Sequence, residues 1–231
     1  MIPLREDSPP ASRPLVTVAL IIACGAAFLS QCLADPALAH RLVIALGAIP
    51  AVLTGHATLP PDLQWLPRGA SIFTSMFLHA SGAHLAGNML FLWIYGHNVE
   101  DAMGHARFLL FYLLCGVIAV LAQTLPEPNS AYPIVGASGA ISGVLGAYLM
   151  LFPRANILTL VLLPFFFTTL RVSAMLLLLL WFAIQLLSDF AVHGDVGVAY
   201  RAHIGGFLGG MLLVILFRRP GVPLFARRRA P

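Results

Sequence analysis

Lysine is absent from this sequence, and charged residues of every kind are scarce. Only 10% of the 231 residues are charged, whereas 59% are hydrophobic. An ordinary soluble domain has about 25% charged residues, so the composition excludes that class and predicts a protein that crosses a membrane several times. All thirteen basic residues are Arg, and Ala, Gly and Pro are abundant. This usage indicates a GC-rich genome and therefore a bacterium.

Cysteine is also rare. The three cysteines lie in apolar segments, and Cys24 and Cys32 would be about 12 Å apart on one helix, too far to pair. Neither a disulfide framework nor a metal site is indicated by their spacing, so we predict no metal and no other cofactor. The Arg cluster of residues 218–231 is typical of a membrane-side anchor rather than of a nucleic-acid site.

Six apolar segments approach the length of about 20 residues that a helix needs to cross a bilayer. We therefore predict an all-α fold, a polytopic transmembrane bundle of six helices within residues 15–217. Residues 1–14 are interpreted as a solvated N-terminal tail and residues 218–231 as a basic C-terminal tail. The predicted helices are 15–34, 72–96, 107–125, 132–152, 172–187 and 202–217.

Two further segments are apolar without being long enough to span. The first loop, residues 35–71, is interrupted by five prolines and is expected to pack on the bundle or to lie in the interface. Residues 157–170 would cover only about 21 Å of a ~30 Å hydrocarbon core. We interpret this piece as membrane-associated rather than as a seventh span.

The arginines set the predicted orientation. With six spans, ten of them fall on the side of the termini and three on the other, which places both termini in the cytoplasm. The three on the outer side are Arg41, Arg68 and Arg201, and the other ten are Arg5, Arg13, Arg107, Arg154, Arg171, Arg218, Arg219, Arg227, Arg228 and Arg229.

This topology places three polar clusters at the same depth in the membrane. Ser138 in the fourth helix, His203 in the sixth, and His84 with Asn88 in the second all fall in the outer half of the bundle. Polar groups at membrane depth are costly and are retained for packing, for pathways or for chemistry. Their coincidence in depth predicts a site near the outer face.

Ser138 has two readings. Gly136, Gly139, Gly143 and Gly146 surround it, and serines are common where small residues let two helices pack closely. Alternatively Ser138 is a nucleophile, because the glycines of the sixth helix, including Gly206 and Gly210, would bring His203 against the fourth.

A Ser138–His203 pair would be a dyad, with the imidazole taking the hydroxyl proton. No acidic residue lies inside a predicted span to make a triad, since Glu100, Asp101, Asp189 and Asp195 all fall in predicted loops. His84 and Asn88 share a helix face and either bind the neighbouring helix or stabilise an oxyanion together with the backbone N–H groups of Ser138 and Ala137. By spacing, His79 lies off that face and is interpreted as structural.

Four motifs in register resemble the rhomboid intramembrane serine proteases. They are Gly136-Ala137-Ser138-Gly139, Ala202-His203-Ile204-Gly205-Gly206 followed by Gly210, His84-Leu85-Ala86-Gly87-Asn88, and Val99-Glu100 followed by Gly104. The resemblance covers nearly everything from residue 71 to 217. It implies a six-helix core, a Ser138–His203 dyad that opens to the outer face, and an oxyanion site at His84 and Asn88. One departure is Ser142, where the family usually has an aromatic residue stacked on the histidine.

The resulting hypothesis is an intramembrane serine endopeptidase that cleaves in or near transmembrane segments of other membrane proteins. We expect it in a bacterial inner membrane, with the lipid bilayer and transmembrane protein substrates as its partners. The sequence carries no signal for a particular oligomeric state. Two rival classes are a catalytically silent factor that binds membrane helices and a transporter, although the internal repeat typical of transporters is absent from the sequence.

Overall fold

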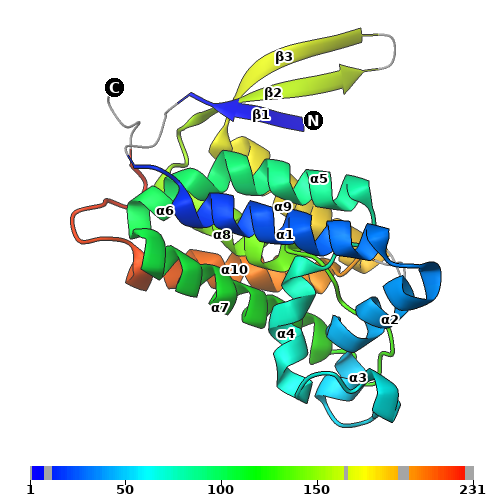
Figure 1. Cartoon of the computed structure of the whole chain (residues 1–231). Helices are drawn as coiled ribbons and strands as arrows, with labels where there is room; N and C mark the ends of the chain where they lie inside the picture. Colours follow the sequence, from blue (N-terminus) through cyan, green and yellow to red (C-terminus); the bar gives the residue numbers. More distant parts are fainter. Residues whose placement is uncertain (1, 8–11, 164–165, 192–197, 227–231) are drawn as a thin grey trace.

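Helices make up most of the molecule in the computed structural model, and a small antiparallel sheet stands against one side of them (Figure 1). The structure describes residues 2–7, 12–163, 166–191 and 198–226. The helices are α1 Leu15–Leu33, α2 Pro36–Leu46, α3 Pro50–Leu53, α4 Ser71–Thr74, α5 Gly82–Phe91, α6 His97–Met103, α7 His105–Thr124, α8 Ser138–Leu151, α9 Ala174–Ala191 and α10 Tyr200–Phe217. Short helical turns occur at Pro61–Leu63 (η1), Arg68–Ala70 (η2), Ser75–Phe77 (η3) and Leu92–Gly96 (η4).

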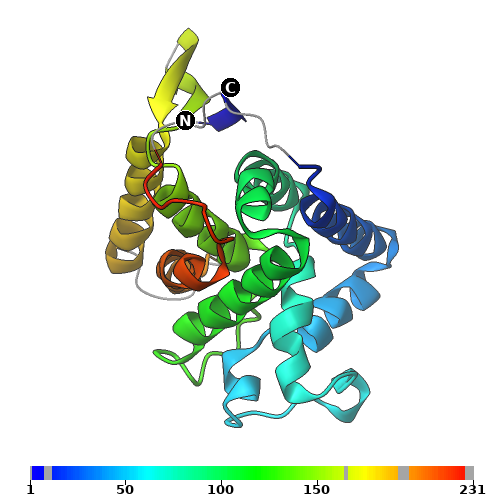
Figure 2. The same cartoon turned by 90° about the vertical axis from the view of Figure 1, so that its left-hand side faces the viewer.

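Four of the helices, α1, α7, α9 and α10, are long and apolar enough to cross a membrane. Two more helical stretches run beside them (Figure 2). One is α5, which continues through the π-helical turn η4 into α6, and the other is the shorter apolar helix α8. The bundle is therefore consistent with the six predicted spans.

The second predicted helix does not run unbroken from residue 72. The chain forms α4 and η3, leaves the helical conformation at Leu78, and starts α5 only at Gly82. Ser81 causes the restart, because its hydroxyl accepts a hydrogen bond from the N–H of His84 at 3.1 Å and so caps the helix. The helical run then extends past the predicted end to Met103 and stops at Gly104, which has a positive φ of 87°.

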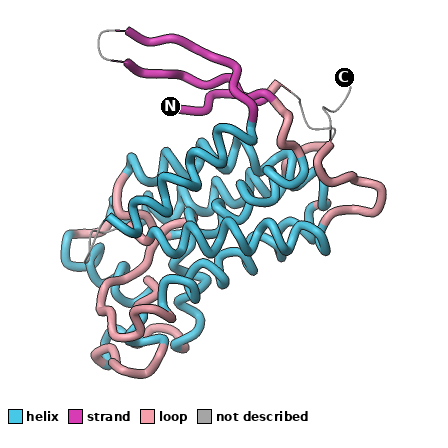
Figure 3. Tube along the Cα trace, turned by 180° about the vertical axis from the view of Figure 1, so that it is seen from behind, coloured by secondary structure: helices cyan, strands magenta, loops and turns pink. Residues whose placement is uncertain are grey.

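Residues 157–163 and 166–170, which lie in the segment interpreted as membrane-associated, form strands. Strands β2 Asn156–Leu163 and β3 Phe166–Ser173 pair antiparallel. Residues Ile2–Glu6 of the predicted N-terminal tail form strand β1, which is mostly exposed and pairs with β2 (Figure 3). A piece too short to span as a helix satisfies its backbone groups by this pairing instead. Since it is not a helix, the count of spans before α10 is unchanged.

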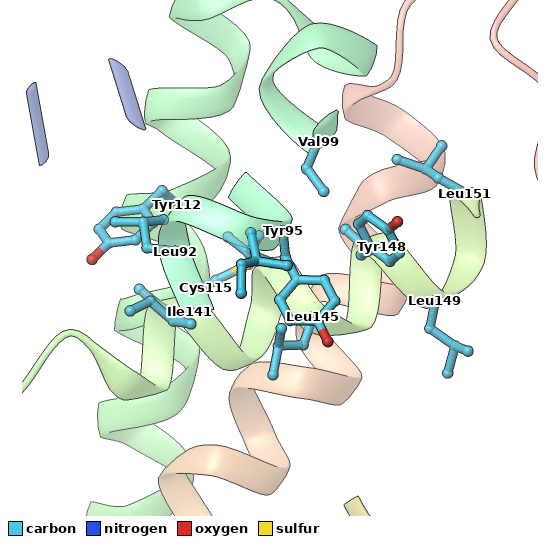
Figure 4. Packing of buried hydrophobic residues seen from close by; sticks show 14 of the residues in the cluster. Leu92, Tyr95, Val99, Tyr112, Cys115, Ile141, Leu145, Tyr148, Leu149 and Leu151 are labelled. Atoms are coloured by element: carbon cyan, nitrogen blue, oxygen red, sulfur yellow. The ribbon is translucent and has the colours of Figure 1, made fainter. Parts of the chain in front are cut away.

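Helix α8 lies at the centre of the bundle. All but one of its residues from Ala140 to Leu151 are buried, and it packs against both α7 and α10. Figure 4 shows Ile141, Leu145 and Tyr148 of α8 among the buried side chains of η4 and α7. A helix that is apolar on all sides and surrounded by others is the expected core of a membrane bundle.

Glycines allow α8 and α10 to come into backbone contact. A Cβ atom placed on Gly206 would overlap the carbonyl oxygen of Gly139, and one on Gly210 would overlap that of Gly143. A Cβ on Gly139 itself would overlap Ala119 of α7. The close approach predicted from the glycine pattern is therefore present, and it leaves no room for a methyl group.

Glu100 is buried at the end of the bundle opposite Ser138. The sequence places it in a loop, but it is a buried residue of α6, 1% exposed. Its carboxylate accepts hydrogen bonds from the backbone N–H groups of Val16 and Thr17, both at 2.8 Å, and from the Thr17 hydroxyl at 2.6 Å. It thus caps α1 from a distant part of the chain. Asp101 and Asp189 are likewise helical, and Asp195 lies outside the described residues.

The glycine contact generates a stability prediction. Gly210→Ala should lower the melting temperature in detergent, because the added methyl group forces α8 and α10 apart at an expected 1–3 kcal/mol. Gly25→Ala is the matched control, since a Cβ on Gly25 of α1 meets nothing within 4 Å. Equal melting temperatures for the two variants would contradict the backbone contact.

The α1 cap generates a second prediction. Glu100→Ala should destabilise the protein by at least about 2 kcal/mol, because it leaves the Thr17 hydroxyl and two amide groups without their acceptor in a buried place. Glu127→Ala removes only a half-exposed ion pair with Arg201 and should cost less than about 1 kcal/mol. Thermal unfolding of both variants in the same detergent measures the difference, and equal losses would rule out the capping role.

Candidate active site

Ser138 is the first residue of α8 rather than a residue inside a longer helix. The predicted helical stretch 132–136 is not helical, because Ile134 pairs with Ala48 in both directions and the N–H of Gly136 donates to Ser75 at 2.9 Å. Gly136 has a φ of 121°, a conformation that favours glycine. The chain therefore turns sharply just before the serine.

This start of the helix leaves amide donors at the serine. The first N–H groups of a helix have no acceptor within it. Within the part of the chain that the structure describes, the N–H groups of Ala137 and Ser138 have no hydrogen-bond acceptor. The positive end of the α8 dipole lies at the same place. An oxygen that gains negative charge beside Ser138 would find two donors and a favourable field.

His203 meets the serine from α10. Its Nε2 lies 2.9 Å from Ser138 Oγ, which is hydrogen-bonding distance. The histidine sits in the first turn of α10, where its own N–H bonds to Ala199 O, and the N–H of the preceding Ala202 donates to Gln123 of α7. Three of the glycines named for packing, Gly139, Gly206 and Gly210, lie along the α8–α10 contact that brings the two side chains together.

The other ring nitrogen of His203 has a partner that the sequence analysis missed. Gln185 of α9 places its Oε1 2.8 Å from His203 Nδ1. An acidic residue is the orienting group expected from the sequence, although a lone amide in the apolar helix 174–191 is itself a signal. Trp181, one turn earlier on α9, lies against the ring, with centroids 6.0 Å apart. Trp181 thus supplies the aromatic contact to His203 that Ser142 cannot make. The Ser142 hydroxyl instead donates a hydrogen bond to Ser138 O at 2.7 Å.

His84 and Asn88 lie across from the serine on α5. A Cβ placed on Gly136 would be 2.8 Å and 2.9 Å from ring atoms of His84, so the imidazole rests against that glycine. Asn88 is 8% exposed, and its Nδ2 has no acceptor among the described residues. The fourth glycine named at the site, Gly136, therefore serves the approach of α5 rather than that of α10.

His79 has a different position from His84. It is 1% exposed, its Nδ1 faces Phe77 O at 3.2 Å, and its ring meets the edge of His84 at a centroid distance of 5.2 Å. Its main chain is held by Gln31 of α1, whose amide bonds both its N–H and its carbonyl oxygen. These contacts agree with a structural residue that supports His84.

A cavity of about 920 Å³ joins these groups. Ser138, His203, His84, Asn88 and Gly136 all line it, at the end of the bundle away from Glu100. At its edge Arg201 pairs with Glu127 at 2.6 Å and with Asp189 at 3.2 Å, which ties the loop after α7 to α9 and α10. Among the described residues, no three His, Cys, Asp or Glu side chains gather as a metal site.

Together these groups make up the parts that acyl transfer needs. The Ser138 hydroxyl contacts the His203 imidazole, and the other ring nitrogen of His203 contacts Gln185. The N–H donors near the hydroxyl are the amides at the start of α8 and the side chain of Asn88. A nucleophile, a base and donors for a developing oxyanion are the three requirements of that chemistry.

Comparisons with known proteins agree on one family. A model described as the Rhomboid domain matches residues 67–220. The chain is 35% identical to Rhomboid protease GluP of Bacillus subtilis (strain 168) over 159 residues, which are 68% of this chain and 28% of that protein. It is 34% identical over 145 residues to Putative rhomboid protease YdcA of the same organism, covering 63% of this chain and 65% of that protein. It is 35% identical over 161 residues to RHOMBOID-like protein 1 of Arabidopsis thaliana, covering 69% and 38%.

The matched region spans less than two thirds of the length of each of these relatives. The domain match nevertheless covers more than half of this chain, and every site residue from His84 to His203 lies within it. The helical membrane bundle and this match give one result: the chain belongs to the rhomboid family.

Proposed function

We propose that this protein is an intramembrane serine endopeptidase that hydrolyses peptide bonds in or near transmembrane segments of other membrane proteins. The observation that carries the proposal is the 2.9 Å contact between Ser138 Oγ and His203 Nε2 at the wall of a cavity. Relatives named as rhomboid proteases support it. A catalytically silent helix-binding factor would need the cavity but would have no use for this contact.

The first half of the reaction is acylation. Ser138 Oγ attacks the carbonyl carbon of the substrate while His203 Nε2 takes the hydroxyl proton. The carbonyl oxygen becomes an oxyanion, and the intermediate collapses when His203 returns the proton to the leaving nitrogen. The new amino terminus departs, and the other half of the substrate remains as an ester on Ser138.

The second half repeats these steps with water. His203 takes a proton from a water molecule, whose oxygen attacks the ester carbon, and the proton then passes to Ser138 Oγ as the ester bond breaks. The cavity volume leaves room for this water beside the serine. The products are a carboxylic acid and the regenerated hydroxyl.

Four donors are assigned to the oxyanion. The backbone N–H groups of Ser138 and Ala137 come from the start of α8, and His84 with Asn88 Nδ2 come from α5. Fixed donors that face a developing charge in a place with little water contribute strongly to catalysis. The assignment gives a use to the buried Asn88 amide that has no acceptor in the described structure.

The substrate must unwind before it can react. A helix in a bilayer bonds every carbonyl internally, which shields the carbon from attack. We therefore assign as substrates those transmembrane proteins whose helices end or weaken near the depth of Ser138. The residue usage supports a bacterial inner membrane, and the segregation of arginines supports cytoplasmic termini and a site toward the outer face.

The dyad generates the central prediction. Ser138→Ala and His203→Ala should each lower cleavage of a model transmembrane substrate in liposomes by at least about 10⁴-fold, because each removes the activated nucleophile. Ser142→Ala is the matched control, because it removes a hydroxyl one turn along the same helix and should keep most of the activity. Cleavage that persists in Ser138→Ala would exclude this mechanism.

The oxyanion assignment generates a separate prediction. Asn88→Leu should reduce kcat by about 10²-fold with little change in KM, because the lost donor acts on the transition state. Gly87→Ala on the same helix is the control, since a Cβ there meets nothing within 4 Å. Steady-state kinetics in detergent measure both constants, and a change confined to KM would argue against the role of Asn88.

A further inference from the structure

Helix α9 carries one buried amide, and that amide faces the histidine of the site. Gln185 is 8% exposed, and the residues of α9 on either side of it along the chain are almost all apolar. Its Oε1 lies 2.8 Å from His203 Nδ1, on the side of the ring opposite Ser138. A buried polar side chain at membrane depth needs a partner, and here the partner is the base.

The atom that Gln185 presents decides which ring nitrogen holds the proton. The oxygen of an amide accepts hydrogen bonds and cannot donate them. Contact with Oε1 therefore requires the proton on His203 Nδ1, which leaves the Nε2 lone pair directed at the Ser138 hydroxyl. The opposite tautomer would place a proton between Nε2 and Oγ, where the base needs a lone pair.

We propose that Gln185 is a positioning residue that selects the reactive tautomer and orientation of His203, so that the catalytic unit has three side chains from α8, α10 and α9. This inference rests on the proposed serine endopeptidase function. It extends that function by assigning the task of the missing carboxylate to a neutral amide.

A neutral acceptor suits this location better than an acid. An ionised carboxylate at membrane depth is costly unless it is paired, and at this position its only partner among the described residues would be His203 itself. The amide oxygen still carries a partial negative charge toward the ring. It therefore stabilises the imidazolium that forms during attack while carrying no net charge itself.

Trp181 complements the amide. It lies one turn before Gln185 on the same face of α9 and contacts both His203 and Phe207, the latter at a centroid distance of 5.9 Å. The indole limits tilting of the imidazole, while Gln185 fixes its rotation about the Cβ–Cγ bond. Both constraints come from α9, so this helix orients the base that α10 carries.

The test compares two replacements of similar shape in the full-length protein. Gln185→Met keeps the length of the side chain and removes the acceptor, whereas Gln185→Glu keeps an acceptor oxygen. We expect Gln185→Met to lower kcat by about 10²-fold or more, with KM within about twofold, and Gln185→Glu to recover most of that loss. Ile184→Ala, on the exposed side of the same helix, is the control and should match the parent.

A spectroscopic measurement separates positioning from simple packing. In protein labelled with ¹⁵N-histidine, the ring nitrogen signals of His203, assigned by their loss in His203→Gln, report which nitrogen carries the proton. We expect Nδ1–H in the parent and in Gln185→Glu, and a shift toward Nε2–H in Gln185→Met. This reading is made on the resting enzyme and needs no substrate.

The outcomes are distinct. Unchanged kcat and an unchanged tautomer in Gln185→Met would overturn the positioning role. A proton on Nε2 of His203 in the parent protein would overturn it too, and that measurement does not require the Met variant to fold. Equal loss in the Met and Glu variants would also overturn it, because a packing role does not distinguish them by their acceptor. Failure of the proposed function differs from all of these, because then Ser138→Ala would cleave as the parent does or the parent would not cleave.

Discussion

The backbones of α8 and α10 touch, and the geometry of the site depends on that contact. Gly139 and Gly143 face Gly206 and Gly210 with no side chain between them. In a bilayer such packing replaces the hydrophobic effect as the force that joins two helices. The 2.9 Å between Ser138 Oγ and the His203 ring leaves little tolerance, since a displacement of about 1 Å can cost 10²-fold in rate. One methyl group on either face would produce a displacement of that order.

The site also depends on where helices begin. α8 starts at Ser138 because a glycine with positive φ and a pairing of Ile134 with Ala48 keep the preceding residues extended. α5 starts at Gly82 because Ser81 caps it. Both starts lie at the same end of the bundle, and the amides of Ala137 and Ser138, which have no acceptor among the described residues, lie beside a cavity lined by polar side chains. A polar pocket can therefore exist inside an apolar bundle, with its charged residues Arg201, Glu127 and Asp189 paired at the edge.

The sequence predicts the main features of this arrangement for clear physical reasons. Hydropathy locates the spans, glycine spacing predicts which helices touch, and depth brings together Ser138, His203 and the α5 pair. Helix boundaries were less accessible, because Leu78 and Tyr132 belong to apolar runs whose breaks depend on local capping and on pairing with the first loop. A hydropathy profile detects the apolar run but not the break in the helix within it.

Interactions between distant segments were not predictable in the same way. β1 pairs with a strand about 150 residues later, and no local pattern near Ile2 reveals that partner. Gln185 does not match the acid that is the usual orienting group, although it is the only amide in the apolar helix α9. Glu100 is expected in a loop because a charged residue between two spans usually lies in water. Its burial requires the amides of Val16 and Thr17, which sequence alone does not place.

The link between Glu100 and the beginning of α1 has a consequence for biogenesis. The carboxylate follows the amide of Val16 by 84 residues, which a ribosome adds in roughly 4 to 17 seconds at ordinary elongation rates. During that interval the amides of Val16 and Thr17 lack the acceptor that they have in the folded structure. The anchoring of the first span is completed only when the second span has crossed in the reverse direction. The N-terminal cap of α1 therefore forms only after Glu100 has been synthesised, so the stable position of α1 depends on a residue that follows the second span.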